Sequence, residues 1–267
     1  GGKPWHCFLL LSPAWISAEY IRGILFSGFS WELLGYSQFE RLPLIQISDI
    51  LGIYGVSCLI TLSNSAIFFV LLYFSGKKWQ NAKISARLAA VSVLVFIISI
   101  ALALAYGYRR INAVDRLIAN ASKARVSVVQ GNIDQAIKWD RAFQTATINT
   151  YTRLSLAALP EDPDLVIWPE SATPFYFLME SKPTEMVMDG IRRANTDFLL
   201  GSPSFNRINH KVEYYVSAYL ISPQGKWYRY NKSHLVPYGE YVPFKKWVPF
   251  LGKIVAHVGD FVPGNKG

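Results

Sequence analysis

The stretch YNKSHLVPYGEYVPF at residues 230–244 decides the fold of the second half of this 267-residue chain. It starts as the end of a strand-like run and continues as a loop rich in Pro and Gly. Lys232 closes the strand, and Glu240 follows eight residues later in the loop, where a carboxylate has no packing role. Open α/β sheets place such strand-end groups at the edge where ligands bind.

A second carboxylate closes an earlier strand. The run VIWPES at residues 166–171 is part of an apolar segment bounded by two prolines, as in a buried strand, and it reaches Glu170. The neighbouring Trp168 is expected to desolvate this carboxylate partly, which suits a general base. Lys232 can hold the oxyanion of a tetrahedral acyl intermediate. These groups predict an acyl-transfer site that lacks only a nucleophile.

Taken singly, the same side chains have structural interpretations. Glu170 can cap the following helix, Lys232 can be a solvated edge residue, and Glu240 can be a surface acid. His234 lies close to them and suggests a Ser/His pair. The sequence has no Gly-x-Ser-x-Gly elbow, so His234 is interpreted as a residue that fixes the loop.

The charge distribution divides the chain in two. Residues 1–108 contain seven Lys and Arg residues and four Asp and Glu residues. Residues 109–267 contain twenty Lys and Arg residues and fourteen Asp and Glu residues. The first part therefore has the composition of a membrane region, and the second that of a soluble domain. The net charge of +9 is spread over both parts without a basic run interleaved with aromatics, so no nucleic-acid partner is expected.

Three apolar stretches in the first part predict transmembrane helices, near residues 8–29, 53–74 and 88–106. The third stretch has 19 uncharged residues, which give a helix of about 28 Å, close to the hydrocarbon thickness of a bilayer. Glu19 and Arg22 in the first stretch are i,i+3 neighbours that can pair. Gly52 and Gly55 are expected to separate the second span from a shallow lead-in.

From about residue 124 short strands alternate with helices, after a linker at 109–123. Strands are predicted at 125–130, 164–168 and 198–201, helices at 142–159 and 184–195, and a hairpin at 212–232 around the turn SPQG. This order predicts an α/β sandwich with mixed strand pairing over residues 124–267.

The two cysteines, Cys7 and Cys58, lie in the apolar part and are interpreted as small buried hydrophobic residues. The Cys and His spacing matches no metal site, so neither a metal nor another cofactor is expected. Because the chain starts without Met and ends in turn-forming residues, both ends are expected to be cuts in a longer protein.

Several segments together resemble one family. They are VVQGNI at 128–133, KWD at 138–140, WPES at 168–171 and NKSHLVPYGEYVP at 231–243. These resemble the apolipoprotein N-acyltransferases, the membrane-bound branch of the nitrilase, or carbon–nitrogen hydrolase, superfamily. EYIRG at 19–23 and GYSQ at 35–38 resemble that family's membrane half. The resemblance implies a multi-span membrane region followed by an α-β-β-α nitrilase-like domain, incomplete at its C-terminus, on the outer face of a bacterial inner membrane.

The resemblance also implies a Glu-Lys-Cys triad. Glu170 matches the general base, Lys232 the oxyanion stabiliser and Glu240 a second essential acid. The implied reaction is ping-pong. A cysteine thiolate takes an acyl chain from a phospholipid as a thioester, and the α-amine of a diacylglyceryl-cysteine at the N-terminus of an apolipoprotein accepts it. Membrane lipid is a further expected partner, and the protein is expected to be a monomer.

Three aromatic residues are the expected substrate-binding residues: Trp139, Tyr238 and Trp247. Trp139 matches a residue on a mobile arm over the family's substrate cleft. Trp247 lies in the segment FKKWVPF at 244–250, whose aromatics and paired lysines suit a lipid interface.

One departure from the family is serious. Its nucleophilic cysteine follows a strand downstream of a segment that matches Phe261–Gly264, and this chain ends at Gly267. Neither Cys7 nor Cys58 can replace it, because both lie in the membrane part. The chain by itself is therefore expected to be inactive. Two alternatives stay open, a membrane-anchored nitrilase-type amidase with a closed small pocket and a non-catalytic membrane scaffold.

Loop charges predict the orientation in the membrane. The loop at 75–87 contains three lysines and an arginine, whereas the loop at 30–43 contains only Arg41. Cytoplasmic loops carry the excess of Lys and Arg. Residues 109–267 are therefore expected outside the cytoplasm.

Reporter fusions after Ala113 and near Lys78 test this orientation. A reporter that works only in the cytoplasm should be active near Lys78 and inactive after Ala113, since the last span separates the two positions. Activity of that reporter at the Ala113 fusion would overturn the predicted topology.

Overall fold

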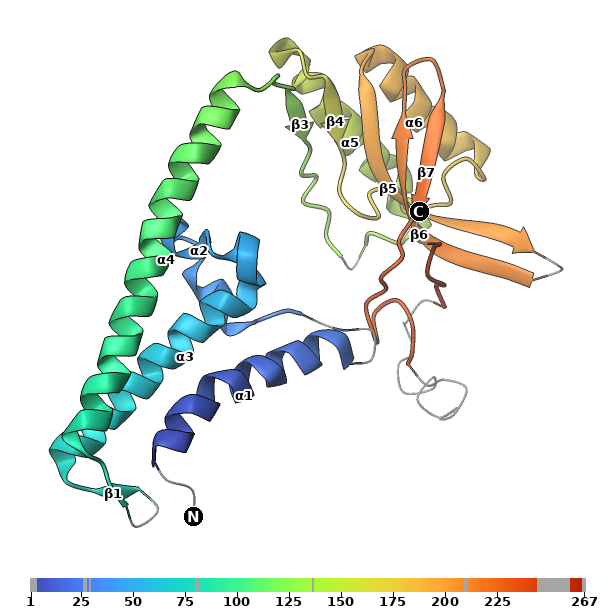
Figure 1. The fold of residues 1–267 in the computed structure, drawn as a ribbon. Coiled ribbons are helices and arrows are strands. Elements are labelled where there is room, and N and C mark those ends of the chain that lie inside the picture. The colour runs from blue at the N-terminus through green and yellow to red at the C-terminus, as the bar shows by residue number, and fades with distance from the viewer. Residues whose placement is uncertain are drawn as a thin grey trace. The chain divides into compact units, whose positions relative to one another are not determined.

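The structure is a computed structural model that describes residues 4–25, 28, 30–79, 82–135, 137–208, 211–243 and 260–265. The chain forms two compact units, Gly1–Ala121 and Ser122–Gly267. Each unit has its own hydrophobic core, and each is described by itself below (Figure 1).

The first unit is helical. Its elements are α1 (Pro4–Ile24), η2 (Leu34–Gln38), α2 (Leu42–Ile45), α3 (Ser48–Ser75), the short paired strands β1 (Lys78–Trp79) and β2 (Ala82–Lys83), and α4 (Ala86–Asn120). Among the described residues, α3 and α4 are the helices that are long and apolar enough to cross a membrane. α1 occupies the first predicted span but ends at Ile24.

The predicted division before the second span lies at Gly52. This residue has φ 60° and ψ −171°, which interrupts the helical geometry of α3, whereas the helix continues through Gly55. A residue without a Cβ adopts this backbone conformation at little cost. The short lead-in and the span are therefore two segments of one element.

α4 continues through most of the predicted linker at 109–123. Arg110 Nε lies 2.7 Å from Asp49 Oδ2 at the start of α3, and Tyr106 donates a hydrogen bond of 2.8 Å to the same carboxylate. A Cβ on Gly107 would lie 1.7 Å from the Pro43 carbonyl oxygen, so only glycine lets α2 approach α4 this closely. These contacts hold α4 against α2 and the start of α3, and the helical unit ends at Ala121.

Glu19 and Arg22 do not form the predicted pair with each other. Glu19 Oε1 accepts the Leu34 N–H at 2.7 Å, and Arg22 donates to the carbonyls of Trp31 and Glu32, each at 3.2 Å. The loop backbone has polar groups that need partners, and these side chains provide them. The two charges thus hold residues 31–34 against the end of α1.

The second unit contains one five-stranded sheet in the order β3-β4-β5-β6-β7 (Figure 1). The strands are β3 (Val126–Val128), β4 (Leu165–Ile167), β5 (Asp197–Ile208), β6 (Lys211–Ile221) and β7 (Trp227–Asn231). β3, β4 and β5 are parallel, whereas β5, β6 and β7 are antiparallel. The predicted mixed pairing is confirmed.

Two helices, α5 (Gln144–Ala157) and α6 (Ser181–Ala194), cover one face of this sheet (Figure 1). The shared core contains Ile148 and Tyr151 of α5, Val187 and Ile191 of α6, and the sheet residues Val166, Phe198, Leu200, Tyr219 and Ile221. The described residues therefore build one sheet and one helical layer of the implied α-β-β-α arrangement.

β5 is much longer than the predicted strand at 198–201. It continues through Pro203 and ends at Ile208. The carbonyls of Leu199 and Gly201 accept hydrogen bonds from the β4 side, from Trp168 and Thr173. By the two-residue period of a strand, the Pro203 nitrogen faces the same side, beyond the last β4 partner of β5. The missing N–H costs no ladder bond, so the proline does not end the strand.

Candidate active site

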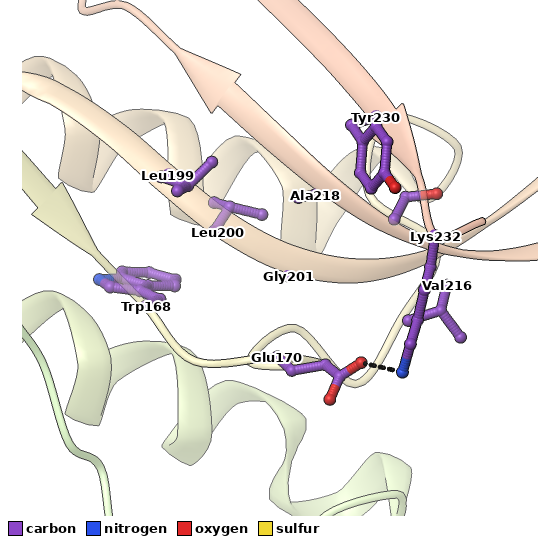
Figure 2. A pocket seen from close by; sticks show the side chains of 10 residues that line it. Trp168, Glu170, Leu199, Leu200, Gly201, Val216, Ala218, Tyr230 and Lys232 are labelled. Carbon is purple, nitrogen blue, oxygen red and sulfur yellow. Dashed lines mark hydrogen bonds and ion pairs between the residues drawn. The ribbon is translucent and has the colours of Figure 1, made fainter. Parts of the chain in front are cut away.

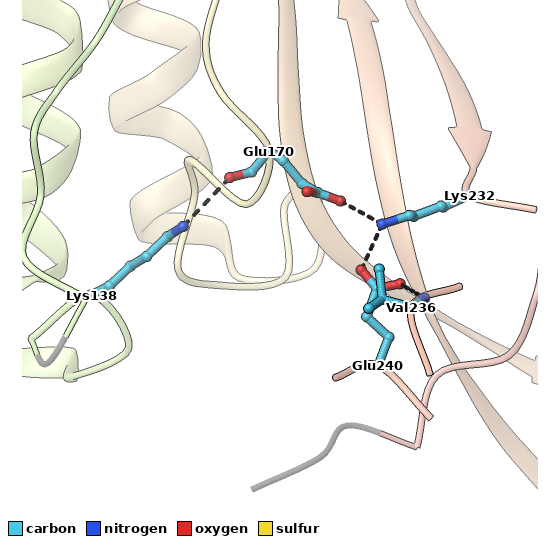
Figure 3. A network of polar contacts seen from close by, with 5 residues as sticks. All are labelled: Lys138, Glu170, Lys232, Val236 and Glu240. Carbon is cyan, nitrogen blue, oxygen red and sulfur yellow. Dashed lines mark hydrogen bonds and ion pairs between the residues drawn. The ribbon is translucent and has the colours of Figure 1, made fainter. Parts of the chain in front are cut away.

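Three charged side chains converge at one edge of the sheet. Lys232 Nζ lies 3.0 Å from Glu170 Oε1 and 2.7 Å from Glu240 Oε1, so the ammonium group bridges both carboxylates (Figure 3). The three residues predicted from the sequence are therefore brought together, although 62 residues separate Glu170 from Lys232.

Trp168 fixes the chain just before Glu170. Its backbone N–H donates to the Leu199 carbonyl at 2.8 Å, and its indole N–H donates to Ser155 Oγ at 2.8 Å. The indole ring also stacks on Tyr151, with 5.1 Å between the ring centroids. These contacts anchor the strand end from which Glu170 projects.

The expected desolvation of Glu170 by Trp168 is wrong. The indole packs into the core under α5, and 62% of the Glu170 side chain is exposed. The carboxylate projects beyond the core because the chain turns immediately after it, with Ser171 at φ 52°.

Gly201 allows this turn to approach β5. A Cβ at position 201 would lie 2.6 Å from the Ser171 nitrogen and 2.7 Å from the Glu170 Cα. Real Cβ atoms do not approach this closely. A side chain at position 201 would therefore displace the segment that carries the candidate base.

Lys232 is held by its backbone at the end of β7. Its N–H donates to the Val216 carbonyl at 2.8 Å, and its carbonyl accepts the Gly264 N–H at 2.9 Å. The preceding residue, Asn231, accepts a hydrogen bond of 2.8 Å from Ser217 through its side chain. The lysine backbone is thus fixed from both sides.

Glu240 closes the loop that follows. Its Oε2 accepts the Val236 N–H at 2.9 Å, and its own N–H donates to the Val236 carbonyl at 2.9 Å. The Phe261 N–H donates to the Glu240 carbonyl at 3.2 Å. With a side chain only 17% exposed, Glu240 is the more buried of the two acids.

The two carboxylates determine the protonation of Lys232. Burial alone lowers its pKa, but the hydrogen bonds and charges of Glu240 and Glu170 outweigh burial and raise the pKa above its usual value. Lys232 is therefore a fixed cation at neutral pH and not a base. A fixed cation can stabilise an oxyanion that develops beside it.

A pocket of about 270 Å³ adjoins this cluster. Figure 2 shows Glu170 and Lys232 facing each other at one end of it. The remaining wall is mostly apolar and is formed by Trp168, Leu199, Leu200, Gly201, Val216, Ser217, Ala218 and Tyr230. The pocket thus places apolar surface beside an acid and a fixed cation.

The predicted aromatic residues have different outcomes. Trp139 is 51% exposed, and Tyr238 is 48% exposed in the loop between Lys232 and Glu240. Trp247 lies outside the residues that the structure describes.

Lys138 was not among the residues predicted for the site, yet its Nζ lies 3.5 Å from the Glu170 carbonyl oxygen. The sequence offered one indication of it, because Lys138 precedes Trp139 in the KWD segment.

In the described part of the chain, no group of three or more His, Cys, Asp or Glu residues is arranged to hold a metal ion. The second unit contains no cysteine, because Cys7 and Cys58 both belong to the first unit. Residues 122–267 thus provide an acid and a fixed cation at this site but no cysteine.

Two families match the chain. Residues 2–66 match the apolipoprotein N-acyltransferase N-terminal domain, and residues 125–262 match the carbon-nitrogen hydrolase family. An apolipoprotein N-acyltransferase from Geobacter metallireducens is 41% identical over 252 residues, which cover 94% of this chain and 46% of that protein. The protein of the same name from Haemophilus ducreyi is 30% identical over 261 residues, which cover 92% of this chain and 47% of that protein.

Among solved structures, a nitrilase-superfamily amidase from Nesterenkonia AN1 is similar with a TM-score of 0.36 and 14% identity, over 54% of this chain and 50% of that one. The chain spans about half the length of the curated relatives that it matches.

The close approach at Gly201 generates a stability prediction. Gly201→Ala should destabilise the protein by about 1–3 kcal/mol, because the new methyl group overpacks the turn at Glu170. The melting temperature should fall by roughly 2–10 °C, measured by thermal unfolding. Gly239→Ala is the matched control, since a Cβ there meets Val236 no closer than 3.5 Å. Equal melting temperatures for the two variants would contradict the packing described.

Proposed function

Because this chain belongs to the apolipoprotein N-acyltransferase branch of the carbon–nitrogen hydrolase superfamily, we propose that it carries the base and the oxyanion-stabilising lysine of an N-acyltransferase. The reaction moves an acyl chain from a phospholipid to the N-terminal amine of a diacylglyceryl-cysteine on an apolipoprotein. The observation that carries the proposal is the position of Lys232 between Glu170 and Glu240, beside an apolar pocket.

In the first half-reaction Glu170 accepts the proton of a cysteine thiol, and the thiolate attacks the ester carbonyl of a phospholipid. Lys232 stabilises the oxyanion of the tetrahedral intermediate. When the intermediate collapses, the ester oxygen leaves with the proton from Glu170 as a lysophospholipid. The acyl chain stays on sulfur as a thioester.

In the second half-reaction the α-amine of the diacylglyceryl-cysteine attacks this thioester. Glu170 takes the amine proton and returns it to the departing thiolate, while Lys232 again stabilises the oxyanion. The product is an amide, and the free thiol is regenerated. Glu240 keeps Lys232 in place throughout, because it binds both the ammonium group and the loop backbone at Val236.

The match of residues 2–66 favours an acyltransferase over a nitrilase-type amidase, since that domain is described as part of apolipoprotein N-acyltransferases. The apolar helices α3 and α4 fit substrates that are anchored in lipid. We place the protein in a bacterial inner membrane as a multi-pass monomer, with the second unit on the outer side. Trp139 and Tyr238, both exposed on loops of the second unit, are the proposed substrate-binding residues.

The catalytic roles are tested in the full-length protein with Glu170→Gln and Lys232→Met. Glu170→Gln removes the proton acceptor and should slow thioester formation by about 10²–10⁴. Lys232→Met removes the cation and should slow it by about 10²–10³. The double variant should be little worse than the worse single variant, because residues that act as a unit are not additive. The measurement is the rate of acyl transfer from labelled phospholipid to protein; a near-native rate in either single variant would remove that residue from the mechanism.

The 267-residue chain by itself should form no thioester, because its two cysteines lie in the first unit. The chain is incubated with labelled phospholipid, and label that hydroxylamine releases is counted. Release should match that of the Cys7→Ser and Cys58→Ser variants. Label that either substitution abolishes would identify that cysteine as the nucleophile and overturn the assignment.

A further inference from the structure

Lys138 approaches Glu170 from the side opposite to Lys232 (Figure 3). Its Nζ lies 3.5 Å from the Glu170 carbonyl oxygen, whereas Lys232 binds the Glu170 carboxylate at 3.0 Å. The site thus contains two lysines and two acids, and they are unequally paired.

Lys232 forms ion pairs with the carboxylates of Glu170 and Glu240, whereas Lys138 forms no ion pair within the described part of the chain. An ammonium group has three donors, and the long contact to one carbonyl uses at most one of them. Burial lowers the pKa of Lys138, and the charge of Glu170 opposes this only in part. An anion that bound Lys138 would restore the stability of its charged form.

The surroundings of Lys138 narrow the kind of anion. Its Nζ lies 5.8 Å from the ring centroid of Trp139, whose indole is exposed. An exposed Trp beside a Lys is the combination that binds at the head-group level of a lipid surface. Lysine is a common partner of phosphate, as a point charge that makes charge-assisted hydrogen bonds.

We propose that Lys138 binds the phosphodiester group of the phospholipid donor and so selects phosphate-containing donors. This inference rests on the proposed function. In that reaction the donor carries a phosphate, whereas the diacylglyceryl-cysteine acceptor carries none at its reacting end. Lys138 therefore acts in the first half-reaction and not in the second.

The test uses the full-length protein with Lys138→Met, Lys138→Arg and the control Lys226→Met, an exposed lysine in the turn between β6 and β7. Thioester formation is measured with two donors, phosphatidylglycerol vesicles and the p-nitrophenyl ester of the same fatty acid, which has no phosphate. A charge-assisted hydrogen bond contributes about 1.5–3 kcal/mol. Lys138→Met should therefore raise the KM for phosphatidylglycerol roughly ten- to hundredfold.

In all three lysine variants the p-nitrophenyl ester should form the thioester at the native rate. The preformed thioester should likewise react with the acceptor amine at the native rate. Lys138→Arg, which keeps the charge, should recover most of the affinity for phosphatidylglycerol. Lys226→Met should behave like the native protein with both donors. Melting temperatures confirm that each variant is folded.

An equal loss of rate with both donors would mean that Lys138 only positions Glu170, and the proposal would fail. Native kinetics of Lys138→Met with phosphatidylglycerol would also overturn it. The assays are run in phosphate-free buffer. If Lys138→Met differed from the native protein only after inorganic phosphate was added, Lys138 would bind the free ion and not the lipid, and the proposal would fail. Failure of the proposed function looks different, because Glu170→Gln would then form the thioester at the native rate.

Discussion

The ammonium group of Lys232, held between Glu170 and Glu240, is the interaction on which the site of the second unit depends. It joins the ends of β4 and β7 to the loop that follows β7. Its contribution to stability is small on the Glu170 side, because that carboxylate is largely solvated and water screens the pair. Its consequence is chemical, since the two acids keep the lysine charged while one of them stays accessible to a substrate.

The direction of the strands brings these groups to one edge of the sheet. β4 is parallel to β5, and two antiparallel steps through β6 make β7 parallel to β5 as well. The carboxyl ends of β4 and β7 therefore lie at the same edge, where α/β sheets bind ligands. Gly201 completes the arrangement, because β5 must pass close beneath the turn that carries Glu170.

The two lysines near Glu170 have different partners. Lys232 donates one hydrogen bond to each carboxylate, and the two acids keep it charged. Lys138 keeps unused donors next to an exposed indole, which suits the binding of an anionic group of a substrate. Glu170 thus lies between two lysines, and the proposals above assign the chemistry to Lys232 and the binding of the donor to Lys138.

The sequence by itself determined the order of strands and helices in the second unit, the break at Gly52 and the three charged residues of the site, because apolar periodicity and turn residues are local signals. Only the tertiary structure decided the passage of β5 through Pro203, the separate partners of Glu19 and Arg22, the exposure of Glu170 and the place of Lys138. Each of these depends on which segments far apart in the chain become neighbours. A backbone group or charge takes its partner from those neighbours, and local sequence does not specify them.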